Sequence, residues 1–142
     1  MSGQTHGLIA ALADQTSSFW ITGGSTQTTM NGNTSTAIGT GQANTNFMKA
    51  QSGYTGGAAK VCDDYTNTET GTGVYSDWYL PSQVELYKLY LNKVAIGGFA
   101  GAYYWSSSEN GKYDAWWQDF SGGGQSSYSK SNAGNVRAIR GF

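Results

Sequence analysis

The chain has 142 residues and a net charge of −1, a length that suits one domain around a single core. Without a basic surplus the sequence lacks the electrostatic footprint of a nucleic-acid-binding protein, so we expect no nucleic-acid partner. No apolar run reaches the roughly 18 residues of a membrane span, which predicts no membrane insertion. Charged residues make up 12% of the chain and aromatic residues 14%, so large apolar side chains are available to order a core.

Charge is unevenly distributed along the chain. Residues 1–85 hold two Lys against six acidic residues, a net −4, and residues 86–142 hold six Lys or Arg against three, a net +3. The mildly basic second part would suit an anionic glycan, although ordinary variation of the surface is the simpler explanation.

The first 65 residues alternate between short apolar runs and long polar stretches. Gly7–Ala13 predicts a strand or short helix, Ser18–Thr22 a short strand, and residues 23–41 a long loop with little apolar surface to bury. Helical spacing with a glycine break covers Asn44–Tyr65. Within it Cys62 is the only cysteine, so no internal disulfide can form, and we expect it to be a buried small hydrophobe.

The strongest local signal is the segment Leu80–Glu85. Ser82 and Glu85 have the spacing of a capping box ahead of an apolar helical pattern. We expect a helix of about 10–12 residues that is closed by Gly97 and Gly98.

Beyond this helix the pattern changes to short β-type runs separated by Gly- and Ser-rich turns. Strands are predicted at Tyr103–Ser107, Ala115–Phe120, Gln125–Lys130 and Val136–Arg140. Two helices followed by a run of strands predict an α+β fold within one domain, residues 1–142, which could also end a longer fibrous protein.

Catalytic and metal-binding patterns are weak. The only His, at position 6, is terminal, so no nucleophilic triad is indicated. Glu109, Asp114 and Asp119 lie among aromatic residues as in a glycosidase, but solvated or hairpin-pairing carboxylates are the simpler interpretation. The acidic stretch Asp63, Asp64, Glu69 and Asp77 lacks any Lys or Arg. It leaves a Ca²⁺ site as an alternative to a solvated helix end, and we otherwise expect no cofactor.

Aromatic residues concentrate between positions 103 and 120. Alternation along a strand separates Trp116 and Phe120 from Trp117, and one face must be core. We expect Trp105, Trp116 and Phe120 inside and Trp117 outward, where an exposed Trp commonly marks a binding surface.

The segment Ser121–Asn135 contains no acid and no aliphatic residue larger than Ala. Its Ser, Gly, Asn and Tyr are the residues that antibody paratopes use for adaptable contact. A plain flexible loop has the same composition, but the strands predicted on either side would hold both ends of the segment.

Several blocks, taken in order, are similar to a known family. They are Gly7–Ala10, Ile38–Thr45, Ala58–Cys62, Ser76–Ser82, Ile96–Ala100, Tyr104–Glu109 and Val136–Arg140. Together they resemble the bacterial and phage domain family that also forms the C-terminal domain of collagen-like adhesins, and that is similar to the C-type lectin fold of formylglycine-generating-enzyme type. The blocks WYLPS and YWSSSE are the most specific, and the resemblance covers nearly the whole chain.

The resemblance implies a mixed lectin-like fold with a ligand surface in its C-terminal part. It also implies extracellular display on a bacterial cell surface or a phage tail, often as a homotrimer. Adhesin relatives bind sulfated glycans, and tail-fibre relatives bind host receptors. Catalytic relatives use paired cysteines and Ca²⁺-dependent lectins a Glu-Pro-Asn loop, whereas this chain has only Cys62 and only Pro81, so neither activity carries over.

Some relatives are diversified by retroelements that mutate template adenines. Residues that such a process generates from an Asn codon occupy positions 110, 111, 113, 114, 119, 121–123, 126–129 and 131–135. Trp116, Gln118, Phe120 and Lys130, which interleave with them, would be fixed positions. We hypothesise a diversified surface.

The leading prediction is a non-enzymatic module that binds a glycan or a cell-surface protein. Rings would anchor the ligand, small polar groups would add hydrogen bonds and two Lys would meet anionic groups. Arg137 and Arg140 are interpreted as structural. The predicted contact residues are Asn110, Lys112, Tyr113, Asp114, Trp117, Asp119, Ser121, Ser126, Ser127, Tyr128, Lys130, Asn132 and Asn135. A trimerisation or capping domain of a fibre and a glycan hydrolase are the alternatives.

Overall fold

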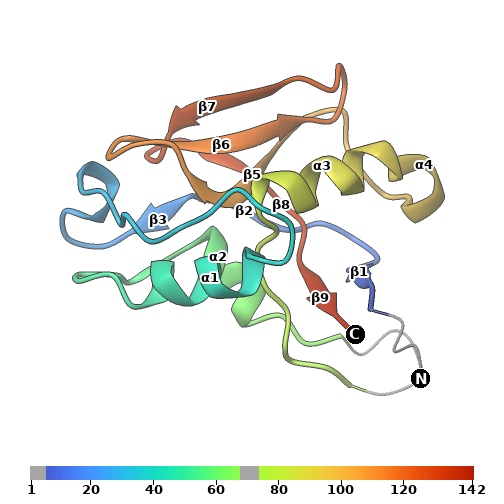
Figure 1. The fold of residues 1–142 in the computed structure, drawn as a ribbon, viewed down its shortest axis with the longest axis horizontal. Helices are drawn as coiled ribbons and strands as arrows, with labels where there is room; N and C mark the ends of the chain where they lie inside the picture. The colour runs from blue at the N-terminus through green and yellow to red at the C-terminus, as the bar shows by residue number, and fades with distance from the viewer. Residues whose placement is uncertain (1–5, 68–73) are drawn as a thin grey trace.

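A computed structural model describes residues 6–67 and 74–142 and shows the predicted α+β fold (Figure 1). Its helices are α1 (Gly41–Lys49), α2 (Ala58–Asp63), α3 (Gln83–Leu91) and α4 (Lys93–Ile96), with a 3-10 turn at Thr26–Thr28. Its strands are β1 (Leu8–Ala10), β2 (Gln15–Phe19), β3 (Ile21–Thr22), β4 (Gly56–Gly57), β5 (Tyr103–Glu109), β6 (Asp114–Asp119), β7 (Gln125–Ser129), β8 (Ala133–Val136) and β9 (Ile139–Gly141). Within the described residues no helix combines the length and apolar character needed to cross a membrane.

The main sheet has five strands in the order β2-β8-β5-β6-β7. β5 and β8 pair in parallel at Tyr104 and Asn135, and the other neighbours are antiparallel. Two-stranded sheets join β1 to β9 and β3 to β4. The first three predicted strands, observed as β5, β6 and β7, therefore lie side by side and form one half of the main sheet up to its edge at β7.

Gly7, near the start of the described residues, and Phe142 meet at one end of the molecule. Gly7 N–H donates to the Phe142 carbonyl and Phe142 N–H donates to the Gly7 carbonyl, both at 3.1 Å, which extends the β1–β9 pairing. Figure 1 places this pairing far from β7, which lies at the opposite side of the molecule.

The predicted capping box is confirmed at the start of α3. Ser82 Oγ accepts from Glu85 N–H, and Glu85 Oε2 accepts from Ser82 N–H at 2.7 Å. The nine-residue helix ends at Leu91, and α4 then continues to Gly97, whose φ of +80° suits glycine. The sequence predicted the start of this helix because the two partners of the capping box, Ser82 and Glu85, lie within four residues of each other.

The helical pattern expected over Asn44–Tyr65 is divided into α1 and α2. Between them Gly57 has φ +118°, and a Cβ there would lie 2.6 Å from the Trp20 carbonyl oxygen. The glycine lets β4 pair closely with β3 before α2 begins. Cys62 is buried in α2, as expected, and burial raises the pKa of its thiol.

Val136–Arg140 is not one strand as predicted. β8 ends at Val136 and β9 begins at Ile139, because the buried Arg137 side chain between them binds groups of two other segments of the protein. Its guanidinium pairs with Asp14 and donates to the carbonyls of Ala11, Gly97 and Gly98. Arg137 is structural, as interpreted from the sequence.

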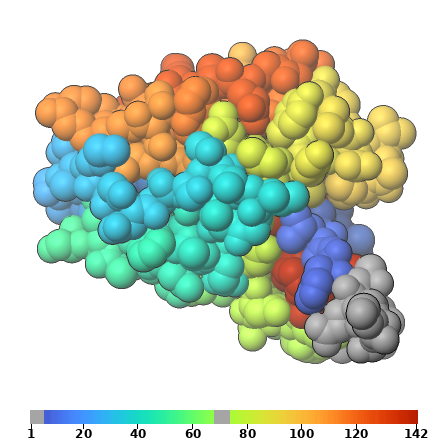
Figure 2. Space-filling view, viewed as in Figure 1, coloured from blue at the N-terminus to red at the C-terminus, as the bar shows by residue number. Residues whose placement is uncertain are grey.

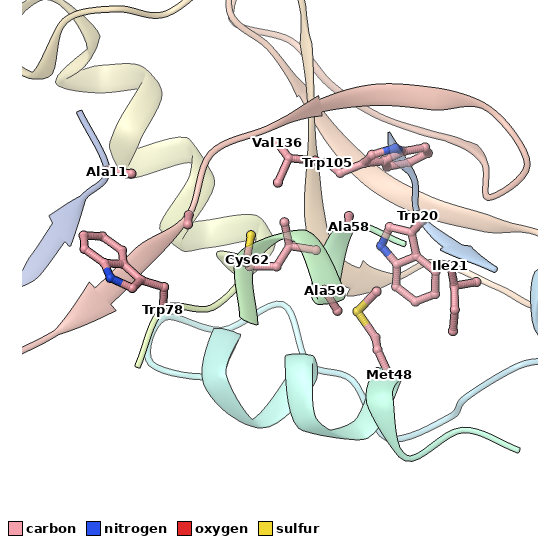
Figure 3. Packing of buried hydrophobic residues seen from close by; sticks show 13 residues of the cluster. Ala11, Trp20, Ile21, Met48, Ala58, Ala59, Cys62, Trp78, Trp105 and Val136 are labelled. Atoms are coloured by element: carbon pink, nitrogen blue, oxygen red, sulfur yellow. The ribbon is translucent and has the colours of Figure 1, made fainter. Parts of the chain in front are cut away.

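Two apolar clusters lie against the main sheet. The larger joins α1, α2 and β8, and Figure 3 shows Trp20, Ile21 and Met48 gathered at one end of it, with Trp78 at the other. The smaller cluster includes Leu86 and Leu89 of α3 together with Tyr104 and Phe120. Trp105 and Phe120 are buried as predicted, whereas Trp116 is only half-buried.

The loop over residues 23–41 is anchored by buried polar groups. Ser35 exchanges two hydrogen bonds with the Asn44 side chain, and its carbonyl also accepts from Ser108 Oγ at 2.8 Å. Glu85 Oε1 accepts from Gly39 N–H. The polar run Ser106–Ser108 of β5 is fully buried because it supplies such partners instead of apolar packing.

Candidate functional site

An aromatic stack crosses three strands of the main sheet. The ring of Trp117 in β6 lies 4.3 Å from that of Tyr103 in β5 and 4.2 Å from that of Tyr128 in β7, with interplanar angles of 20° and 10°. Since β5 and β7 flank β6, the two tyrosines cover opposite faces of the indole. We call Tyr103, Trp117 and Tyr128 the aromatic stack.

The stack changes the expected role of Trp117. The indole is half-buried rather than outward, contacts Trp105 at 5.3 Å and packs against the larger core cluster. Its Nε1 donates to Ser126 Oγ at 2.7 Å. The ring surface left to solvent belongs mainly to Tyr103 and Tyr128, which are 44% and 45% exposed.

Tyr103 is not among the predicted site residues. Its position follows from strand register, because Tyr103 pairs with Asp119 and Trp105 with Trp117. The hairpin spacing of the two strands was the available signal, but a bulge at Ser106–Ser108 hides the register from simple counting.

The turn between β5 and β6 exposes a second group of predicted residues. Asn110 and Gly111 donate their N–H groups to the Asp114 carbonyl, which leaves the side chains of Asn110 and Lys112 in solvent. Lys112 Nζ lies 4.8 Å above the centre of the Tyr113 ring, which is 51% exposed. We define the candidate ligand surface as the aromatic stack with Asn110, Lys112, Tyr113 and Ser126.

Asp119 and Ser121 are used by the turn between β6 and β7. Asp119 Oδ1 accepts from Ser121 Oγ at 2.6 Å and from Ser121 N–H at 2.8 Å. These bonds lower the pKa of the Asp119 carboxyl. Both residues are accessible to solvent, but their hydrogen bonds to each other stabilise the turn of the hairpin.

Lys130 lies outside the candidate ligand surface, so its predicted contact with anionic ligand groups is wrong. Its side chain is 0% exposed, and Nζ lies 2.7 Å from Glu109 Oε2, whose own side chain is 1% exposed. Nζ also donates to the carbonyls of Lys112 and Thr29 and lies over the Trp20 ring. Burial lowers the pKa of Lys130, and the hydrogen bond and charge of Glu109 oppose that shift.

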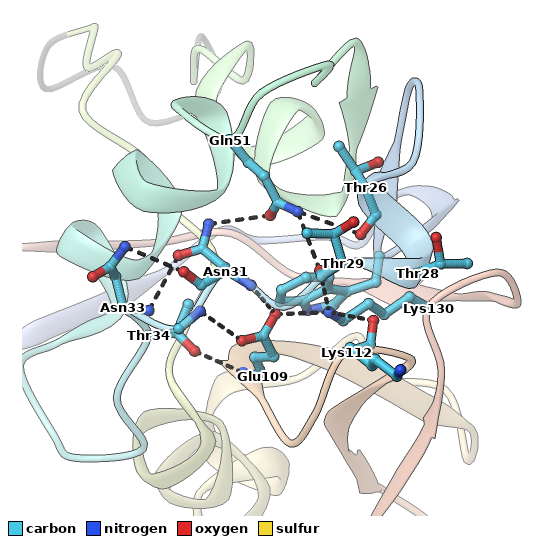
Figure 4. A network of polar contacts seen from close by, with 12 residues as sticks. Thr26, Thr28, Thr29, Asn31, Asn33, Thr34, Gln51, Glu109, Lys112 and Lys130 are labelled. Carbon is cyan, nitrogen blue, oxygen red and sulfur yellow. Dashed lines mark hydrogen bonds and ion pairs between the residues drawn. The ribbon is translucent and has the colours of Figure 1, made fainter.

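Glu109 completes a network that ties the long loop to β5 (Figure 4). Its carboxylate accepts from the N–H groups of Asn31 and Gly32, and its N–H donates to Thr34 Oγ1. Because every near contact of this carboxylate is internal, Glu109 is held away from solvent. Asp114 and Asp119 sit at the two ends of β6.

The remaining predicted residues are spread along β7 and β8. Ser127, Asn132 and Asn135 are half-buried, and Tyr104 Oη contacts the side chain of Asn135. Asn132 N–H donates to the Ser129 carbonyl within the turn that precedes β8. Asn135 thus lies with the smaller core cluster and away from the aromatic stack.

Three of the acidic residues considered for Ca²⁺, Asp63, Asp64 and Asp77, are paired with basic residues. Lys49 contacts Asp63, Lys60 contacts Asp64, and Arg140 makes two hydrogen bonds to Asp77 and stacks on Tyr75. Glu69 lies outside the described residues. In residues 6–67 and 74–142 no three His, Cys, Asp or Glu side chains gather as metal ligands.

Comparison with models of known protein families matches residues 12–140 to the Lcl C-terminal domain. A search of curated proteins gives no match. The matched range includes the main sheet, all four helices and the candidate ligand surface.

Proposed function

The chain belongs to the Lcl C-terminal domain family, a C-type-lectin-like family, and on this premise we propose that it is a non-enzymatic module that binds a glycan or a cell-surface protein. The observation that carries the proposal is the aromatic stack, which leaves large ring surfaces of Tyr103 and Tyr128 in solvent. Exposed Tyr beside small uncharged groups such as Ser126 is a composition typical of binding surfaces.

The geometry assigns different roles to the rings. Trp117 fixes the two tyrosines, since each uses one face against the indole. The outer faces of Tyr103 and Tyr128 remain for ligand contact, and Tyr113 adds a third exposed ring. Lys112 is the exposed cation beside this surface and would meet an anionic group of the ligand.

A catalytic role has little support from the same geometry. A glycosidase needs two carboxyl groups facing one substrate position. Glu109 is instead bound by Lys130 and two backbone N–H groups inside the protein. This arrangement favours binding over hydrolysis.

We further propose, from the resemblance, the formylglycine-generating-enzyme variant of the lectin fold, display on a bacterial surface or phage tail, and assembly as a homotrimer. Retroelement diversification of the C-terminal segment belongs to the same proposal. Packing divides that segment, because Gly123 and Gly134 would place a Cβ within 2.5 Å of Tyr90 Oη and 2.8 Å of Trp105 Nε1. Only positions without such contacts could vary freely.

The test is a binding screen against glycans and cell-surface proteins. We expect Tyr128→Ala, Tyr103→Ala and Lys112→Ala each to weaken binding of the tightest ligand from the screen by at least about tenfold, because each removes a proposed contact residue. Tyr87→Ala on α3 is the matched control, because Tyr87 is an exposed tyrosine of another element. Binding unaffected by all three surface changes would place the site elsewhere.

A further inference from the structure

β7 is an edge of the main sheet. It pairs with β6 over five consecutive residue pairs, from Asp114–Ser129 to Gln118–Gln125, without a break in register. Figure 1 shows no element beyond it, and in Figure 2 the orange and red residues of this region form the upper rim of the molecule. The outer side of β7 therefore faces solvent.

The hydrogen-bond pattern identifies which backbone groups face outward. Asp119 N–H donates to the Gly124 carbonyl and Lys130 N–H donates to the Tyr113 carbonyl. Antiparallel pairs alternate, so the backbone groups of Ser126 and Tyr128 also point toward β6, and those of Gln125, Ser127 and Ser129 point away.

Most of the outward groups have no partner in the part of the chain that the structure describes. The Ser129 carbonyl accepts from Asn132 N–H. Among residues 6–67 and 74–142, no hydrogen bond satisfies the N–H and C=O of Gln125 and Ser127 or the N–H of Ser129, so these groups can accept a further partner. Groups on one side of a strand recur about every 6.8 Å, a spacing that another β-strand matches.

β7 also lacks the features that usually protect an edge strand. It has no charged residue, no proline and no bulge. The opposite edge of the same sheet, β2, is irregular, with a shift of register between Gln15 and Ser18. Of the two edges of the main sheet, the β7 edge is therefore the regular template for strand addition.

We propose that β7 accepts an extended segment of a protein ligand as a sixth strand. The inference rests on the proposed binding function and selects protein over glycan, because a sugar chain has no matching alternation of N–H and C=O groups. The outer face of Tyr128 borders the edge and would receive an apolar side chain of that segment. An uncharged segment fits best, since β7 carries no charge to balance.

The test uses substitutions that act on one backbone group. Ser127→Pro removes an outward N–H, which an edge strand tolerates, whereas Ser127→Ala keeps it. Ser126→Pro removes an N–H that points toward β6 and should lower the melting temperature, whereas Ser127→Pro should not. This contrast checks the assignment of the free side before binding is measured.

The probe is a display library of random linear peptides selected on the wild-type domain. We expect enriched peptides to bind wild type and Ser127→Ala equally and Ser127→Pro at least about tenfold more weakly. The proposal is overturned if no peptide is enriched, or if enriched peptides bind Ser127→Pro as well as wild type. It is also overturned if sedimentation shows wild type, but not Ser127→Pro, pairing with a second copy.

Failure of this inference is distinguishable from failure of the proposed function. A glycan or receptor found in the screen that is lost in Tyr128→Ala but kept in Ser127→Pro supports the binding function and contradicts strand addition. If the screen finds no ligand for wild type, the proposed function itself fails.

Discussion

Lys130 Nζ lies 2.7 Å from Glu109 Oε2, and neither side chain reaches solvent. The pair joins the turn before β8 to the end of β5, and Glu109 in turn holds the backbone of Asn31 and Gly32. A lysine in a Ser- and Gly-rich segment is thus an internal support for the polar loop.

Glu109→Gln should destabilise the protein by about 3–5 kcal/mol, because it leaves the buried Lys130 ammonium without a counter-charge. The free energy of unfolding from denaturant titration measures this. Asp64→Asn is the control, since it breaks the exposed pair with Lys60 and should cost about 1 kcal/mol or less. Equal costs for the two variants would mean that the buried pair does not stabilise the loop.

The rings of Trp117 and Tyr128 should be energetically coupled. In a double-mutant cycle of Trp117→Ala and Tyr128→Ala, the coupling should be about 0.5–1.5 kcal/mol, the range for stacked aromatic pairs. Tyr113→Ala, whose ring lies under Lys112 Nζ, should be additive with Trp117→Ala. Additivity in the first pair would contradict the stack as a structural unit.

Gly134→Ala should destabilise the protein by about 1–3 kcal/mol. The new Cβ would lie 2.8 Å from Trp105 Nε1 and would displace the indole from its hydrogen bond to the Ser18 carbonyl. Gly124→Ala has open space around it and should change stability by about 0.5 kcal/mol or less. Thermal unfolding compares the stabilities of the two variants. If Gly134→Ala leaves the melting temperature unchanged, packing against Trp105 does not restrict which residue can occupy position 134.

Acidification should remove the stabilising effect of Asp77. Its hydrogen bond with Arg140 is the main reason that the pKa of Asp77 is lowered in the folded protein. A lowered folded-state pKa gives stability that is present above the unfolded carboxyl pKa, about 3.9, and is lost as pH falls through the folded value.

Melting temperatures of wild type and Asp77→Asn should therefore differ at neutral pH and converge on acidification. Arg140→Met should show the same convergence, because it removes the other member of the same ion pair. If the difference in melting temperature between wild type and Asp77→Asn stays constant with pH, the stabilisation by Asp77 does not depend on its ionisation.

Local signals in the sequence predicted the fold better than the site. The capping box of Ser82 and Glu85 and the hairpin strands from Tyr103 to Ser129 depend on neighbours in sequence, and the structure confirms them. The fate of Lys130 depends on Glu109 and on Thr29, about a hundred residues away, so local composition could not show its burial.

The aromatic stack was only partly predictable for a related reason. Alternation separates Trp116 from Trp117, but the bulge in β5 and the pairing of β7 decide which rings meet. Composition predicted Tyr128 as a contact residue and gave no reason to choose Tyr103, whose ring position depends on register.

The two backbone hydrogen bonds between Gly7 and Phe142 suit the domain to insertion into another protein. Gly7 and Phe142 lie side by side and far from β7, so a domain that begins at Gly7 could be inserted into a surface loop of a host protein with little stretching of either junction. Such a graft would carry the exposed edge and the aromatic stack outward on a new carrier.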